Sequence, residues 1–167
     1  MGSPERSMQD IPFSTGASRV LEIARAYGNL PPEGRGTDEV AHAGTEHLLL
    51  ALTTSSDIQA ILAATRIPFD PLVADLVDYI NTDPNHPTTD EQGQTDTFVS
   101  SLNNALRLAE EYGEVTPVHL YAGMIESGRG KALMTLGRFL GFSEEDREAT
   151  PFIQDALFEH IPSMRRE

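Results

Sequence analysis

The chain has 167 residues, no cysteine and a net charge of −14. A chain of this length can bury a core without disulfides, and the lack of cysteine excludes disulfide scaffolds, cysteine metal sites and thiol catalysis. The acidic excess argues against a nucleic-acid or anionic membrane partner, and no apolar run reaches the roughly 20 residues that a membrane span needs. The N-terminus lacks the basic and apolar regions of a secretory signal, so we expect a cytoplasmic protein.

The first half of the chain shows four helical patterns behind a flexible lead at 1–12. Three helix starts are predicted at the N-cap residues Ser14, Thr45 and Asp70, and the proline after Asp70 suits the first helical position. A short further helix is predicted around Ile58. The apolar residues at helical spacing, which we expect to face inward, are Ala17, Val20, Leu21, Ala24, Ile58, Ile61, Leu62, Val73, Leu76, Val77 and Ile80.

The second half shows four more helical patterns and no strand alternation. Thr97 and Thr116 are the predicted N-caps of its first two helices, and Pro117 follows the second of them. The last helix starts after either Ser143 or Thr150, and both starts stay open. The expected inward residues are Val99, Leu102, Leu106, Ala109, Ala132, Leu133, Leu136, Leu140, Ile153, Ala156 and Leu157. The chain is therefore predicted to be all-α, with eight helices.

Two landmarks indicate an internal repeat. His47–Leu48 aligns with His119–Leu120 at an offset of 72 residues, and Phe69-Asp70 aligns with Phe142-Ser143 at an offset of 73, which one single-residue gap reconciles. We align Phe13 with Phe98 at an offset of 85, because a Pro/Gly-rich loop lengthens the first half. These offsets predict a tandem pair of four-helix repeats. Each repeat alone has few large apolar residues, so we expect the two to pack together as one pseudo-symmetric domain.

A polar segment divides the two repeats. Residues 81–96 include no apolar side chain, so burial cannot offset the entropy lost on ordering them, and we interpret them as a linker or long loop. The predicted organisation is a lead at 1–12, a first repeat at 13–80, the linker, a second repeat at 97–161 and a tail at 162–167.

One segment resembles a known family. The run Ala43–Leu52, Ala-Gly-Thr-Glu-His-Leu-Leu-Leu-Ala-Leu, is similar to the signature of the Clp repeat at the front of Clp unfoldases. The helices predicted after Ser14 and Asp70 are similar to the start and end of such a repeat, and the resemblance covers about 13–160. In the second repeat Pro117-Val118 stands where threonine and glutamate are expected. The resemblance implies a binding module that docks adaptors and unfolded or tagged substrates for an ATPase ring.

Thr45 and Glu46 are the candidate binding residues. The Thr45 hydroxyl and the helix amides offer donors to an anion, and the Glu46 carboxylate offers an acceptor to a cation. The resemblance implies that this pair lies in a pocket that reads phosphoarginine on tagged substrates. The second pocket would hold Thr116, Pro117 and Val118, and it lacks the carboxylate. The alternative is that Glu46 is only a first-turn acid favoured by the helix dipole.

Several polar and aromatic residues allow two interpretations. His47 and His119 either hydrogen-bond within the first turns of their own helices or form a shared metal or catalytic pair. Phe98 and Tyr121 either belong to the core or line a peptide groove between the repeats. The acidic run at 144–146 is either a solvated face or a surface for a basic adaptor.

The sequence holds no motif for catalysis. It has no Gly-x-x-x-x-Gly-Lys-Ser/Thr phosphate loop, no Gly-x-Ser-x-Gly elbow and no His-Glu-x-x-His zinc motif, and we interpret Gly128–Lys131 as a polar turn that enters a helix. We expect no enzyme activity, no cofactor and no metal. The expected partners are proteins or peptides: Clp substrates, adaptors, or Clp ATPase and protease components. The alternatives are a stand-alone Clp-repeat protein that acts as a decoy or regulator of Clp proteolysis, and a small metal-binding protein that uses histidines and acids.

Overall fold

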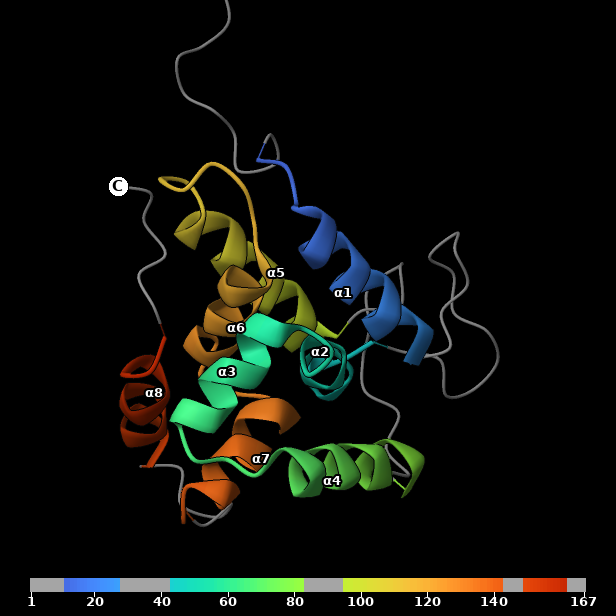
Figure 1. Cartoon of the computed structure of the whole chain (residues 1–167), viewed down its shortest axis with the longest axis vertical. Coiled ribbons are helices and arrows are strands. Elements are labelled where there is room, and N and C mark those ends of the chain that lie inside the picture. Colours follow the sequence, from blue (N-terminus) through green and yellow to red (C-terminus); the bar gives the residue numbers. More distant parts are fainter. Residues whose placement is uncertain (1–10, 28–42, 83–94, 143–148, 162–167) are drawn as a thin grey trace, which may run out of the picture.

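The predicted all-α fold is confirmed. The computed structural model describes residues 11–27, 43–82, 95–142 and 149–161, and these residues form eight helices (Figure 1). They form no extended strand, although an isolated bridge joins Phe13 to Val115. The helices are α1 (Thr15–Tyr27), α2 (Thr45–Leu52), α3 (Ser56–Ala64), α4 (Phe69–Thr82), α5 (Asp96–Leu108), α6 (Pro117–Glu126), α7 (Lys131–Phe139) and α8 (Thr150–Phe158).

Helix α1 follows its sequence pattern closely. The N–H of Ala17 donates to the Ser14 hydroxyl at 3.1 Å, so Ser14 is the N-cap, as predicted. The four buried residues of the helix are the four that the spacing selected: Ala17, Val20, Leu21 and Ala24.

Two threonine caps differ from the prediction. The N-cap of α5 is Thr95, whose hydroxyl accepts the N–H of Phe98 at 3.2 Å, and Thr97 is already inside the helix. The N-cap of α2 is Gly44, so Thr45 is the first helical residue. Both predictions are wrong by one or two residues, because a cap rule based on residue type does not distinguish neighbouring candidates.

The start of α4 also differs from the prediction. The N–H of Leu72 donates to the carbonyl of Pro68 at 3.1 Å, and the helix begins at Phe69. Asp70 is therefore a first-turn acid and not the N-cap. Pro71 is tolerated because an amide in the first turn has no partner inside the helix.

The buried faces differ from the predicted faces in two helices. In α4, Leu72 and Leu76 are fully buried, whereas Val77 is 40 % exposed. In α5, Phe98 is fully buried, and Tyr121 of α6 is also fully buried. Phe98 and Tyr121 are therefore core residues, and the interpretation that they line an open peptide groove is wrong.

The remaining starts agree with the sequence to within a residue. Thr116 is the N-cap of α6 and Pro117 its first residue, as predicted. Helix α8 begins at Thr150, and its N-cap is Ala149. Of the two starts left open, the one after Thr150 is within a residue of the observed start. Ser143 lies outside the described residues.

The contacts between helices reveal two related halves. Helices α2 and α6 lie at the centre and contact each other, and both are buried at nearly every position. Three contacts of α2 have counterparts on α6: α1 on α2 and α5 on α6, α4 on α2 and α8 on α6, and α7 on α2 and α3 on α6. Figure 1 shows α8 to the left of these central helices and α4 below them, towards the lower right. The two four-helix repeats thus form one pseudo-symmetric domain.

Backbone hydrogen bonds cross between the repeats at both helix entrances. The N–H of Ser14, which caps α1, donates to the carbonyl of Val115 at 2.8 Å, and the N–H of Val115 donates to Pro12 at 2.9 Å. In the other half, the N–H of Thr95, which caps α5, donates to the carbonyl of Ala43 at 2.9 Å. The start of each repeat is therefore fixed by the residue that precedes the central helix of the other.

These bonds correct the repeat alignment. The equivalent caps Ser14 and Thr95 are 81 residues apart, so Phe98 corresponds to Ala17 and the alignment of Phe13 with Phe98 is wrong. The offset of 72 between His47 and His119 holds.

The ends and the middle of the predicted organisation stay predictions. The lead at 1–12, the linker at 81–96 and the tail at 162–167 fall mostly outside the described residues, although α4 continues to Thr82 and α5 starts at Asp96. Within the described ranges no single helix is long and apolar enough to cross a membrane; α2 and α3 meet that criterion only jointly, across a bend of 98°.

Candidate functional site

The two histidines close equivalent first turns. The N–H of Gly44 donates to His47 Nδ1 at 3.0 Å, and the N–H of Thr116 donates to His119 Nδ1 at 3.0 Å. Both histidines are buried, at 3 % and 1 % exposure. Each ring therefore accepts the amide of its own N-cap residue, which confirms the structural interpretation of the pair. No group of three or more histidine, aspartate or glutamate side chains suited to a metal occurs in the described part of the chain.

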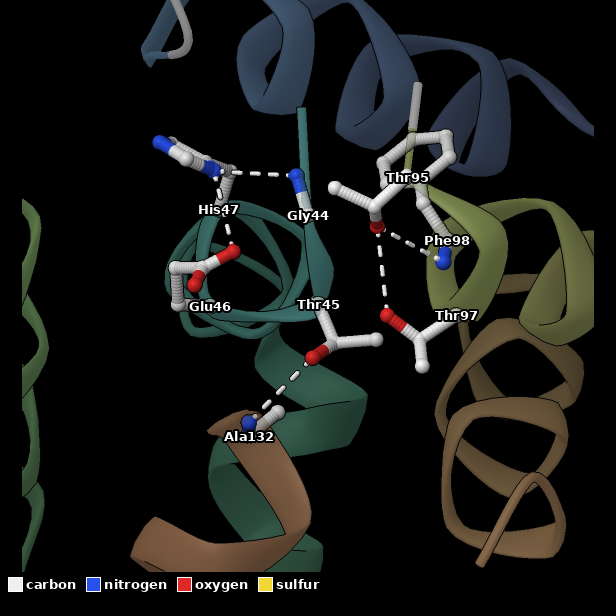
Figure 2. Close-up of polar contacts among 8 residues, drawn as sticks. All are labelled: Gly44, Thr45, Glu46, His47, Thr95, Thr97, Phe98 and Ala132. Atoms are coloured by element: carbon white, nitrogen blue, oxygen red, sulfur yellow. Dashed lines mark hydrogen bonds and ion pairs between the residues drawn. The ribbon is translucent and has the colours of Figure 1, made fainter. Parts of the chain in front are cut away.

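Thr45 caps a helix of the other repeat. The N-cap of α7 is Gly130, which has no side chain to accept an amide. The Thr45 hydroxyl accepts the N–H of Ala132 in its place, at 3.3 Å (Figure 2). Gly130 has φ +106°, and a Cβ there would lie 2.7 Å from Thr45 Oγ1, so the glycine allows this close approach. The prediction that Thr45 caps its own helix is wrong.

Glu46 is enclosed beside the same turn. Its residue is 5 % exposed, and its carboxylate folds back over Gly44, where any Cβ would overlap Oε1. Glu46 Oε1 lies 3.3 Å from His47 Nδ1. Because that nitrogen accepts the Gly44 amide, it presents a lone pair, and the contact becomes an ion pair only if the ring is protonated.

The structure thus separates the two residues of the predicted first pocket. In Figure 2 the Thr45 side chain points towards Ala132 of α7, and the Glu46 side chain points towards His47 on another side of α2. Both are buried, and neither lines a described cleft.

An open cleft lies instead at the second predicted pocket. Thr116 and Pro117 line it, together with residues of α1 and of the junction between α2 and α3. We call it the repeat cleft; its volume is about 670 Å³. Arg19 and Asp57 give its walls opposite charges. The lining residues are Ser14, Gly16, Arg19, Val20, Ile23, Thr54, Ser55, Ser56, Asp57, Thr116 and Pro117.

A second hollow lies along α3. Val118, the third residue of the predicted second pocket, lines this hollow and not the repeat cleft. Asp57 borders both. We call it the α3 groove; its volume is about 380 Å³, and its lining residues are Asp57, Ala60, Ile61, Ala64, Val118 and His160.

Sequence reasoning did not find Arg19, Asp57 or His160. Each is a polar residue on an exposed helix surface or end, and the chain separates them widely. The Ser55-Ser56-Asp57 run could have been recognised as a helix start, but no local pattern shows that this start faces Pro117. The acidic run at 144–146 lies outside the described residues.

Comparison with known proteins supports the repeat architecture. A family model described as the Clp repeat (R) N-terminal domain matches residues 37–139, which include α2 to α7. None of the curated protein sequences matches the chain. Domains of that family are non-catalytic and mediate protein–protein interactions in Clp systems. Because the match covers more than half of the chain and both central helices, this chain belongs to the Clp repeat N-terminal domain family.

Proposed function

We propose that the chain recognises protein segments for a Clp unfoldase and protease system, as substrates, degrons or adaptors. The observation that carries this proposal is the repeat cleft. It lies where the two repeats meet, with α1 and the start of α3 from one and the start of α6 from the other. Clefts of a few hundred Å³ between packed elements are the usual places for ligands.

The chemistry of the repeat cleft suits a peptide. The half-buried Ile23 supplies apolar surface for side chains, and the buried Val20 and Pro117 lie beneath the same cleft. Serine and threonine hydroxyls on the walls can donate to or accept from peptide amides and carbonyls. Arg19 and Asp57 can each pair with a charge on the segment. A cleft with these features needs no cofactor to bind an unfolded chain.

Binding of a permanently unfolded protein tests the proposal. Biotinylated full-length chain is immobilised, and reduced, carboxymethylated lactalbumin is passed over it in an interferometry experiment. We expect saturable binding that is weakened on the order of tenfold by Ser56→Tyr, because the new ring fills the cleft. Ser18→Tyr is the matched control, since Ser18 is exposed on α1 and does not line the cleft. No binding, or equal binding by both variants, contradicts the proposal.

We propose phosphoarginine recognition at Thr45 and Glu46 as a separate property. It is supported by the positions of the two residues in the first turn of α2 beside helix amides. The ligand would have to draw the Thr45 hydroxyl away from the N–H of Ala132. Arginine phosphate is therefore expected to shift the Ala132 amide resonance of the labelled chain. Glu46→Ala should abolish that shift, and an unchanged affinity in this variant would refute the pocket.

A further inference from the structure

Helices α4 and α8 occupy equivalent positions in the two repeats, and their buried residues can be aligned one by one. Leu72 and Leu76 are the buried residues of α4, and Ile153 and Leu157 are those of α8. Both pairs correspond at an offset of 81 residues. The two helices differ in length, since α4 has 14 residues and α8 has 9. Among the described residues, the last turn of α4 therefore has no helical counterpart after Phe158.

In the first repeat, the later turns of α4 cover the flank of α7. The Lys131 ammonium, at the first residue of α7, lies 5.3 Å from the centre of the Tyr79 ring. Arg138 donates to Asp75 at 2.9 Å further along the same pair of helices. The register makes His160 the counterpart of Tyr79, just beyond the end of α8.

In the second repeat, the described residues leave the corresponding flank of α3 uncovered. His160, the counterpart of Tyr79, carries an imidazole ring, is exposed and lines the α3 groove. Ala60 and Ala64 on α3 are exposed along this groove, with Val118 of α6 beside them. Asp57, in the first turn of α3, stands at the border of this groove.

We propose that the α3 groove binds an aromatic or large aliphatic side chain of a protein segment that carries a neighbouring lysine or arginine. In the first repeat the later turns of α4 pack against α7, with the Tyr79 ring beside the Lys131 ammonium. The charge is reversed: that ring lies under a lysine, whereas the α3 groove is bordered by the Asp57 carboxylate. A lysine or arginine of the partner therefore suits the end of the α3 groove that Asp57 borders.

The apolar floor of the groove offers a guanidinium no side-chain acceptor. Val118 stands where the first repeat has Glu46, and a valine side chain accepts no hydrogen bond. Ala60, Ile61 and Ala64 are also apolar. The apolar side chain of the partner thus enters the groove and its cation stays at the rim with Asp57. Aromatic residues and arginine are the residue types that most often anchor such interfaces.

This inference rests on the proposed function and names the segment that the chain prefers. A groove of about 380 Å³ is within the size range of small ligand sites. It shares the lining residue Asp57 with the repeat cleft. A segment with its aromatic residue in the α3 groove could therefore extend past Asp57 towards the repeat cleft.

Nitrogen-15 NMR titration of the full chain tests the groove. The probe is a six-residue glycine- and serine-based peptide that contains phenylalanine followed by lysine. The matched peptides replace the phenylalanine with alanine or the lysine with glutamate. We expect shifts at Ala60, Ala64 and Val118, and binding weakened on the order of tenfold without the phenylalanine and about threefold without the lysine.

Paired variants of α3 provide the control. Ala60→Lys places a bulky cation in the groove and should reduce binding of the phenylalanine–lysine peptide on the order of tenfold. Ala63→Lys adds the same charge to an exposed position of α3 that does not line the groove, and should leave binding unchanged. Equal binding of the alanine peptide, or equal binding by both variants, would overturn the inference.

Two further outcomes separate this inference from the proposed function. Groove resonances that shift with chain concentration in the absence of peptide would show that a second copy of the chain occupies the groove, and would overturn the inference. If unfolded lactalbumin binds in a Ser56-dependent manner but no peptide enters the groove, only the groove inference fails. If neither probe binds, the proposed function fails with it.

Discussion

The Tyr121 hydroxyl is buried without a hydrogen-bond partner among the described residues. Burial raises the pKa of this phenol above its usual value, because the charged form is poorly solvated in the core. Tyr121→Phe removes the unpaired hydroxyl and keeps the ring. We expect the free energy of unfolding to stay equal or rise by about 1 kcal/mol, measured by urea denaturation. A loss of stability would show that the hydroxyl has a partner, such as an ordered water.

The pH dependence provides a second readout of the same residue. A phenol whose pKa is raised in the folded state holds its proton more tightly there than in the unfolded chain. Its contribution to stability is therefore complete below the unfolded pKa of about 10 and declines as the pH rises beyond it. Tyr121→Phe should lose less stability above about pH 10 than the parent chain.

At the scale of the helices, α7 depends on a residue from the other repeat. Thr45→Val keeps the shape of the side chain and removes the acceptor for the N–H of Ala132. We expect a loss of about 1 kcal/mol, as for a deleted N-cap, together with faster hydrogen exchange at Ala132. Thr54→Val is the control, because the Thr54 hydroxyl donates to Ala51 at the end of its own helix. Unchanged exchange at Ala132 in Thr45→Val would show that the cap is unimportant.

The sequence predicted the helices better than their starts. Helical periodicity is a local property, and it located all eight helices and the whole buried face of α1. The start of α2 depends on a distant element, since Thr45 bonds to Ala132 and leaves Gly44 as the cap. The start of α5 is tied to Ala43 through Thr95. Rules that see only neighbouring residues do not contain these contacts.

The prediction of the candidate site was likewise limited to what neighbouring residues determine. Thr116 and Pro117 were selected by their place in the repeat, and they line the repeat cleft. Thr45 and Glu46 were selected by the same argument and are buried. Pro117, the counterpart of Thr45, is also buried, but it borders the repeat cleft, whereas the start of α7 closes over Thr45 through Ala132. Sequence equivalence therefore did not predict which of the two turns borders a cleft.

At the scale of the whole molecule, the two repeats share one core. The central helices α2 and α6 contact each other, and each also contacts helices of the opposite repeat. The net charge of −14 is spread over a chain whose two described hollows both include Asp57. An acidic surface of this kind favours the approach of basic segments, and more so at low ionic strength.

The backbone hydrogen bonds between the repeats limit how many repeats this fold can hold. In solenoid proteins each repeat leaves an edge for the next, so copies can be added without end. Here the N–H of Ser14 donates to Val115 and the N–H of Thr95 donates to Ala43. The first residues of each repeat are therefore already hydrogen-bonded to the other repeat. The pair is a closed set of two. A third copy appended to this chain would find no equivalent edge, and would have to pair with a fourth.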